Sequence, residues 1–222
     1  MKFILLMLMS FSLIANEDPW EEMNRSTFEF NQTLDENIFE PVAKSYKENA
    51  PKPVQNRVSD FSSNVGDIGT LGNEIAQLEI LNSANTLGRV LINSTIGLFG
   101  LFDVASDIGL EKTKEDFGQT LAVWGTPEGP YVVLPVLGPS SVRGATGVAV
   151  DGMQKVSQTK HLTSAQKIGI NITQAVDTRV KLLPATDLLK KADDPYITTR
   201  SAYLQSSKYN VYNGDLPDDD EF

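Results

Sequence analysis

Few side chains in this sequence could carry out nucleophilic or metal chemistry. His161 is the only histidine and cysteine is absent, so no His/Cys set can bind a metal ion. Ser140 or Ser141 could act as a nucleophile with His161 as base, which would make the chain a lipid hydrolase. The G-x-S-x-G motif of such enzymes is absent around them. We expect one of these serines to cap a helix and His161 to lie in a polar linker.

Two carboxylates, Asp103 and Asp107, lie one helical turn apart and could face a common site. Acids at this spacing more often cap a helix or sit on its solvated face. We therefore expect no catalytic residue, no metal and no cofactor.

The composition excludes several classes of protein. The 222-residue chain has 29 acidic and 19 basic side chains, a net charge of −10. A chain this acidic lacks the positive surface of nucleic-acid-binding proteins. Without cysteine it forms no disulfide and offers no cysteine for a lipid anchor. Hydrophobic residues make up 41% of the chain, enough for a packed core in one domain.

The first residues are typical of a secretory signal peptide. Lys2 is followed by an apolar run from Phe3 to Ile14 and by the small residue Ala15. This run is shorter than the roughly 20 residues that span a bilayer, and no later segment is apolar over that length. We expect residues 1–15 to be a signal peptide cleaved after Ala15. An uncleaved N-terminal anchor is the alternative.

Apolar residues recur at helical spacing along most of the remaining chain. Between Met23 and Tyr46 they form one stripe, with a break expected near residues 37–40, ahead of Pro41. Further helices are expected over 54–68, 71–80, from Asn82-Ser83 to Ile96, 116–124, from Ser140 or Ser141 to Met153, 164–183 ended by Pro184, and from Asp194-Pro195 to Ser207. The predicted fold is all-α, a single domain over 16–214 followed by a disordered acidic tail at 215–222.

Two apolar segments rich in glycine and proline interrupt this pattern. Residues 91–105 carry Gly97 and Gly100 and contain neither Lys nor Glu. Residues 125–139 contain four prolines, which exclude a continuous helix or a central strand, yet residues 131–137 are strongly apolar. Because backbone groups in such loops need partners, we expect the loops to line a cavity or to contact acyl chains.

A series of short motifs resembles the MlaA/VacJ family in order and approximate spacing. They are Asp18-Pro-Trp-Glu-Glu-Met-Asn-Arg25, Phe28-Glu-Phe-Asn31, Leu34-Asp35, Pro41-Val-Ala43, Asn93-Ser-Thr-Ile-Gly97, Phe102-Asp-Val-Ala105, Asp116-Phe-Gly-Gln-Thr-Leu121, Trp124-Gly125, Gly129-Pro-Tyr131, Leu134-Pro135, Gly138-Pro-Ser140 and Asp194-Pro-Tyr196. No single motif is specific for the family, but the whole ordered series is. The resemblance extends from Asp18 to about Gly214.

The resemblance implies amphipathic helices that form a ring-like, membrane-embedded platform with Gly/Pro-rich apolar loops. It implies a place in the inner leaflet of an outer membrane, around an amphipathic channel, with a trimeric porin as partner. The implied role is to remove misplaced phospholipids from the outer leaflet and pass them to a soluble periplasmic lipid carrier. No bond is broken, and lipid asymmetry is maintained.

Within this resemblance, the candidates for the lipid path are Phe99, Leu101, Phe102, Tyr131, Val133, Leu134 and Leu137. The chain departs from the family in one respect, since members are typically lipoproteins and no cysteine follows the signal here. Membrane attachment must then come from helix insertion, a porin partner or an uncleaved N-terminus. A soluble periplasmic module that binds an apolar ligand is the alternative function.

Overall fold

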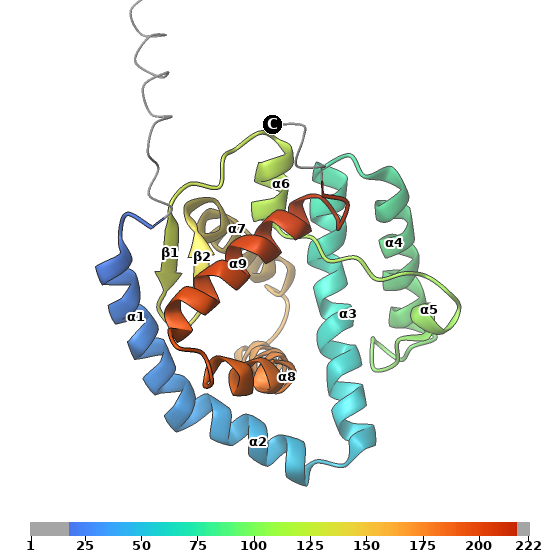
Figure 1. Ribbon diagram of the computed structural model, residues 1–222. Helices are drawn as coiled ribbons and strands as arrows, with labels where there is room; N and C mark the ends of the chain where they lie inside the picture. Colours follow the sequence, from blue (N-terminus) through green and yellow to red (C-terminus); the bar gives the residue numbers. More distant parts are fainter. Residues whose placement is uncertain (1–17, 217–222) are drawn as a thin grey trace, which may run out of the picture.

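The computed structural model describes residues 18–216, which are predominantly helical (Figure 1). The elements are α1 (Glu21–Leu34), the π-helix η1 (Asp35–Phe39), α2 (Glu40–Asn49), α3 (Lys52–Ala76), α4 (Ile80–Thr95), α5 (Val104–Asp107), α6 (Phe117–Val123), β1 (Tyr131–Leu134), β2 (Gly138–Ser141), α7 (Val142–Gln158), α8 (Ser164–Leu189) and α9 (Pro195–Val211). The predicted helical fold class is confirmed. The predicted signal peptide at 1–15 and the end of the predicted tail, 217–222, lie outside the described residues.

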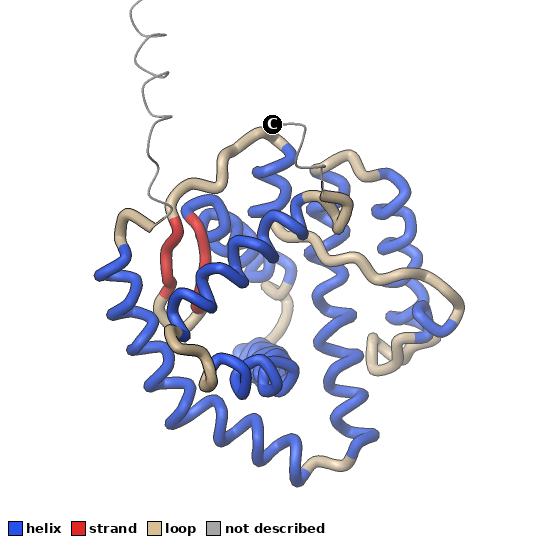
Figure 2. Tube along the Cα trace, in the orientation of Figure 1, coloured by secondary structure: helices blue, strands red, loops and turns tan. Residues whose placement is uncertain are grey.

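The elements contact one another in a closed circuit. α1, η1 and α2 form a continuous arm, β1 packs on α1, and β2 packs on α7. α7 contacts α6, which reaches α3, and α3 follows α2 after a short turn. Figures 1 and 2 show α1 and α2 along one side and α3 and α4 along the other. α8 contacts both α2 and α3, so it joins the two sides.

The N-terminal arm changes its helical winding at η1. The N–H of Glu40 bonds the carbonyl of Asp35, five residues back rather than four. Pro41 has no N–H, so the carbonyl of Asn37 loses its usual helical partner. The break expected near residues 37–40 is confirmed, and it takes the form of a π-turn between two continuous helices.

Five helices begin at a capping side chain. Asp103, Asp116, Ser141, Thr163 and Asp194 each accept a hydrogen bond from the backbone N–H three residues ahead. The expected cap from the Ser140-Ser141 pair is confirmed at Ser141, and Asp194 with Pro195 opens α9 as predicted.

Other predicted helix boundaries are wrong. The helix expected over 71–80 is the last part of α3, and α4 begins at Ile80 without the cap expected from Asn82-Ser83. Pro184 lies inside α8, which continues to Leu189. Its neighbour Leu183 is buried, and packing of α8 against α2 and α3 carries the helix past the proline.

The apolar segment over 125–139, predicted as a loop, contains a pair of strands. β1 and β2 pair antiparallel, with Val133 opposite Pro139. A proline is tolerated here because the sheet has two strands, and each therefore has a free edge. The all-α prediction needs this one correction, whereas the exclusion of a central strand is confirmed.

Two asparagines of α1 satisfy the outer edge of the hairpin. The Asn24 amide donates to the carbonyl of Tyr131 (3.1 Å) and accepts from the N–H of Val133 (2.9 Å). Seven residues on, Asn31 donates to the carbonyl of Leu134 (2.9 Å) and accepts from the N–H of Val136 (2.7 Å). Side chains two helical turns apart thus replace a third strand.

Candidate lipid-contacting site

The distribution of polarity is the most unusual property of the structure. The fully buried hydrophobic side chains are Ala43, Ala105, Tyr131, Val133, Leu183 and Tyr196, whereas the buried polar ones are Asp18, Asn24, Glu40, Asn64, Asp67, Thr70, Asn73, Glu74, Thr86, Arg89, Asn93, Glu115, Gln119, Thr120, Ser140, Ser141 and Asp177. Ordinary soluble domains bury mainly apolar residues, and charged ones only when paired. Polar groups therefore fill most of this interior.

The helix pair α3–α4 shows this inversion most clearly. α3 buries polar side chains only, among them Asp67 and Asn73, and α4 buries only Thr86, Arg89 and Asn93. Many apolar residues of both helices face outward: Ile75 is 58% exposed and Leu91 is 57% exposed, whereas others such as Phe61 are half-buried. An amphipathic helix that buries its polar face places its apolar face in contact with something other than its own core.

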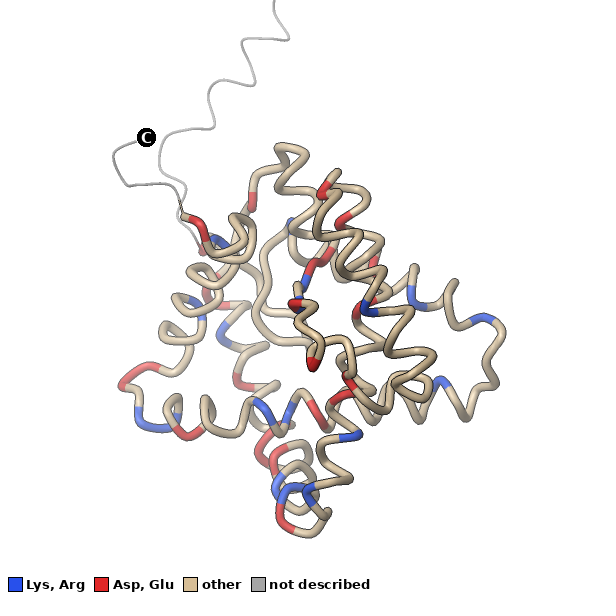
Figure 3. The backbone as a smooth tube through the Cα atoms, turned by 90° about the vertical axis from the view of Figure 1, so that its right-hand side faces the viewer, with Lys and Arg blue, Asp and Glu red and all other residues tan. Residues whose placement is uncertain are grey.

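The most exposed apolar stretch runs from the start of α4 to the turn after it. Residues 80–102 contain one charged residue, Arg89, and that residue is fully buried. Leu81 and Phe99, near the two ends of this stretch, are each 86% exposed. Figure 3 shows that long parts of the trace carry neither basic nor acidic residues. A surface of this kind is typical of a protein or membrane contact.

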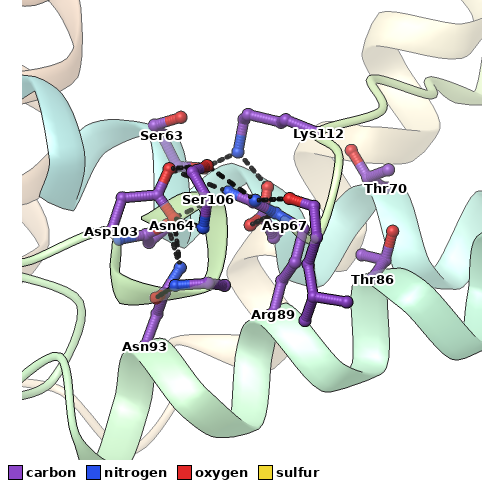
Figure 4. A network of polar contacts seen from close by, with 12 residues as sticks. Ser63, Asn64, Asp67, Thr70, Thr86, Arg89, Asn93, Asp103, Ser106 and Lys112 are labelled. Atoms are coloured by element: carbon purple, nitrogen blue, oxygen red, sulfur yellow. Dashed lines mark hydrogen bonds and ion pairs between the residues drawn. The ribbon is translucent and has the colours of Figure 1, made fainter. Parts of the chain in front are cut away.

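A buried polar network holds this stretch in place (Figure 4). The Arg89 guanidinium pairs with Asp67 of α3 (3.2 Å) and forms two hydrogen bonds of 3.0 Å to Asp103, the residue before α5. It also donates to Ser106 Oγ (2.9 Å) and to the carbonyl of Leu110 (2.7 Å). One side chain thus joins α3, α4 and the segment around α5.

Asn93 completes the network beside Arg89. Its amide donates to Asn64 (2.8 Å) and to Asp103 (2.9 Å), and its carbonyl oxygen accepts from the N–H of Ala105 (2.9 Å). Burial raises the pKa of Asp103, but hydrogen bonds from Ser106, Asn93 and Arg89 outweigh it and lower that pKa to about 2. Asp103 therefore stays ionised opposite Arg89 and also caps α5.

The turn that follows α4 has a strained backbone. Leu98 (φ 52°), Phe99 (φ 59°) and Gly100 (φ 86°) all lie in the left-handed region. A Cβ at Gly97 would come within 2.3 Å of the carbonyl oxygen of Phe102, so no other residue fits there. This backbone course directs Phe99 outward, and the network at Asp103 anchors its far end.

The hairpin divides the other candidate residues between core and surface. Tyr131 and Val133 are buried and pack with Tyr196, so they do not present their side chains to the outside. Leu134 is half-buried, and Leu137 at the turn is 66% exposed. Burial alternates along β1 because successive strand residues point to opposite faces. The apolar loop expected over 131–137, lining a cavity or contacting acyl chains, is therefore corrected to a strand with one core face and an exposed turn.

The seven candidates thus fall into two groups. Phe99, Leu101, Phe102 and Leu137 are exposed, and Leu134 is partly so, but the structure does not bring the 97–102 turn and the hairpin turn into one cavity. The exposed turn Leu78–Leu81 was not among the predicted features. Neither was the buried polar stripe of α3, although its spacing of three to four residues is a signal for it.

The residues proposed for hydrolytic chemistry are not assembled. Ser141 is buried, and its Oγ accepts from the N–H of Gly144 (3.0 Å) as a helix cap. His161 lies exposed in the turn between α7 and α8, and no contact joins it to either serine. Among residues 18–216 no group of three metal-binding side chains occurs. Asp103 and Asp107 cap and extend α5 without forming a shared site.

The architecture defines a helical protein whose buried side chains are mainly polar and whose surface exposes many large apolar side chains. The family model described as MlaA lipoprotein matches residues 16–210, and the chain belongs to that family. It is 32% identical over 206 residues to the intermembrane phospholipid transport system lipoprotein MlaA of Escherichia coli, covering 91% of this chain and 81% of the relative. The corresponding Haemophilus influenzae protein is 31% identical over 208 residues, covering 92% and 83%.

Two further comparisons agree with this assignment. An uncharacterised protein of Rickettsia typhi, RT0044, is 35% identical over 195 residues, covering 87% of this chain and 78% of the relative. A structure solved in work on the maintenance of bacterial outer membrane lipid asymmetry matches with a TM-score of 0.74 and 31% identity, covering 87% of this chain and 98% of the solved one. The resemblance seen in the motifs is therefore confirmed.

Proposed function

We propose that this protein is a non-catalytic component of intermembrane phospholipid transport at the outer membrane. In this role it removes misplaced phospholipids from the outer leaflet and passes them to a periplasmic carrier, which maintains lipid asymmetry. The observation that carries the proposal is the inverted polarity, because phospholipid transport needs a polar route for head groups and an apolar surface against acyl chains. The names of the relatives point to the same process.

The exterior suits a position within one leaflet. No helix of residues 18–216 has both the length and the hydropathy to cross a bilayer. Exposed side chains such as Leu81, Leu98 and Phe99 nevertheless surround the α3–α4 pair. Each large apolar side chain moved from water into lipid contributes about 1.5–3 kcal/mol. About three of them match a single myristoyl anchor, whose binding constant of about 10⁴ M⁻¹ corresponds to about 5.5 kcal/mol.

The exposed apolar side chains offer a way for the chain to attach to its membrane. The sequence has no cysteine that could carry a lipid, although the family is one of lipoproteins. We propose that the apolar exterior supplies the attachment, together with a trimeric porin as a partner in the same membrane. A soluble carrier in the periplasm receives the lipid. The signal peptide proposed at residues 1–15 provides export.

The test is complementation of a deletion strain. Loss of the gene should raise phospholipid in the outer leaflet and increase detergent sensitivity, and the wild-type chain should restore both. Phe99→Asp should fail to restore them, because a carboxylate is costly to bury in lipid. Gln158→Asp, at an exposed polar position in α7, is the matched control and should complement. A deletion strain with normal outer-leaflet phospholipid would contradict the proposal.

Fractionation separates this function from the alternative, a soluble periplasmic module that binds an apolar ligand. The absence of an anchoring cysteine is the observation that favours the alternative. The proposal predicts that the protein sediments with membranes and needs detergent for release. A protein found wholly in the soluble fraction without detergent would support the alternative.

A further inference from the structure

A small cavity lies between α1, the hairpin turn and the connection from α8 to α9. Its volume is about 210 Å³. Phe28, Pro139, Leu189 and Pro195 provide apolar wall, whereas Asp35, Glu36, Lys190 and Thr199 bring polar groups to it. Sites that hold whole drug-sized ligands measure about 300–1,000 Å³. This cavity therefore fits a head group with the first atoms of its chains, and not a complete lipid.

A cluster of ion pairs lies beside this cavity. Asp35 accepts two hydrogen bonds from Arg179, at 2.6 and 2.7 Å. The buried Glu40 accepts from Lys190 at 2.9 Å and pairs with Lys44 at 2.7 Å, and Arg179 is 3.9 Å away. Three cations thus share two carboxylates. These hydrogen bonds lower the pKa of Glu40 to about 2, so its charge is permanent at neutral pH.

Two donors of this region are buried and have no partner within the protein. They are Nη1 of Arg179 and the hydroxyl of Thr199, and Thr199 lines the cavity itself. An Arg in a purely structural ion pair would gain by using all its N–H groups, because an unsatisfied buried donor costs free energy. An acceptor with several oxygens, such as a phosphate, would satisfy both groups.

Glu36 adds the opposite charge to the same cavity. Its carboxylate accepts from Gln32 (3.0 Å) on the preceding helical turn and lines the cavity. A ligand that carries only negative charge would be repelled by Glu36. A ligand with a phosphate and, a few bonds away, an ammonium group would match Lys190 with its phosphate and Glu36 with its ammonium.

We propose that this cavity is a binding site for a zwitterionic phospholipid head group of the phosphoethanolamine class. Lys190, Thr199 and Arg179 hold the phosphate, Glu36 holds the ammonium, and Phe28, Pro139 and Leu189 contact the glycerol and the first methylenes of the acyl chains. The inference rests on the proposed phospholipid transport and gives it a head-group preference.

The experiment is lipid binding to the purified full chain in detergent, measured by native mass spectrometry. The lipids are phosphatidylethanolamine and phosphatidylglycerol with the same acyl chains. The soluble probes are glycerophosphoethanolamine and inorganic phosphate, which separate a lipid site from a general phosphate site. Wild type should prefer phosphatidylethanolamine and bind inorganic phosphate weakly. Equal affinity for the two lipids, or binding of inorganic phosphate as tight as that of the lipid, would overturn the inference.

Three variants locate the site. Lys190→Ala should weaken phosphatidylethanolamine binding about tenfold, the effect of losing one charge-assisted hydrogen bond. Lys191→Ala removes the same charge at the exposed neighbouring position and should leave binding unchanged. Glu36→Gln should weaken phosphatidylethanolamine binding and spare phosphatidylglycerol, which has no ammonium. Lys190→Ala and Glu36→Gln proteins that bind both lipids as the wild type does would place the head group elsewhere.

A second readout covers loss of folding and separates the two proposals. Thermal unfolding of each variant without lipid identifies a folding defect, and Thr199→Val removes one ligand without removing a charge. If Lys190→Ala does not fold, Thr199→Val and Glu36→Gln decide the outcome. A wild-type protein that binds neither lipid contradicts the proposed function itself, whereas one that binds both equally contradicts only the head-group site.

Discussion

The α3–α4 pair and the region around the hairpin hold the same chain together in opposite ways. Between α3 and α4 the buried side chains are polar and centre on the Arg89 ion pairs. At the hairpin Tyr131, Val133 and Tyr196 form a buried apolar cluster, with the two tyrosine rings packed edge to face at a centroid distance of 6.1 Å, beside the buried polar residues Asn24, Ser140 and Ser141. The buried face of α4 is therefore polar, and its exposed face is apolar.

The difference follows from what lies outside each region. If lipid surrounds α3 and α4, as proposed, moving apolar residues inward gains no hydrophobic free energy, so polar contacts must fix how the helices pack. The aromatic cluster instead joins three elements far apart in sequence, and it does so by excluding water as in a soluble domain. On the proposed placement in lipid, one structure would combine the packing of a membrane protein and that of a soluble protein.

Removal of the central cation should separate the two regions most strongly. Arg89→Leu leaves the buried Asp67 with Lys112 alone and the half-buried Asp103 without its cation, and we expect a loss of about 3 kcal/mol in the free energy of unfolding. Denaturant unfolding in detergent measures it. Arg57→Leu is the comparison, since that side chain is partly exposed. It pairs with Asp60, donates to the carbonyl of Leu101 and lies over the Phe102 ring, and its loss should cost less, about 1–2 kcal/mol. Equal losses in the two variants would show that the network does not stabilise the helix pair.

In the aromatic region the size of the ring should matter more than a hydroxyl. Tyr131→Ala should cost about 3 kcal/mol, because it removes a fully buried ring. The hydroxyl of Tyr131 has no partner, so Tyr131→Phe should be neutral or stabilising. Tyr196→Phe removes a hydrogen bond to the buried Asp18 and should cost about 1.5–3 kcal/mol. A Tyr131→Phe loss as large as that of Tyr196→Phe would contradict this assignment.

Two glycines differ in how much space surrounds the position of a Cβ, one in the turn after α4 and one in α7. A Cβ at Gly97 would meet the carbonyl oxygens of Phe102 and Asn93 at 2.3 and 2.5 Å, so Gly97→Ala should destabilise by about 1–3 kcal/mol. Gly152 in α7 has open space around it, and Gly152→Ala should stabilise by about 0.5–1 kcal/mol. Melting temperatures of the pair give the sign, and a stable Gly97→Ala protein would show that the turn after α4 is not tightly packed.

The sequence allowed prediction of most helices, because their apolar residues repeat at helical spacing. The caps at Ser141 and Asp194 and the break before Pro41 depend on local backbone chemistry and were predicted correctly. The hairpin was missed because its outer edge is satisfied by Asn24 and Asn31, more than 100 residues away. Local sequence carries no sign of such a partner.

The candidate site was predictable only in part. Phe99 and Leu137 are exposed in glycine- or proline-containing turns, as their apolar sequence suggested. A periodic apolar stripe shows that a helix is amphipathic but not which face is buried, and α4 buries the polar one. The cavity at Lys190 joins elements from both ends of the chain, so only the folded structure reveals it.

The polar region should also make the stability of the protein depend on pH. Burial raises the pKa of Glu115 to about 7, with further increases from Glu79, Asp116 and Glu74, although a hydrogen bond from Gln77 opposes the shift. The carboxyl of Glu115 therefore binds its proton more tightly in the folded state than in the unfolded state, where its pKa is about 4.5. Because of this difference, the free energy of unfolding should fall as the pH rises from about 4.5 to 7. The fall should be about 1–2 kcal/mol. Glu115→Gln should abolish it, and Glu111→Gln, an exposed acid of the same segment, should not. Unfolding curves across this range would contradict the assignment if wild type and Glu115→Gln showed the same slope.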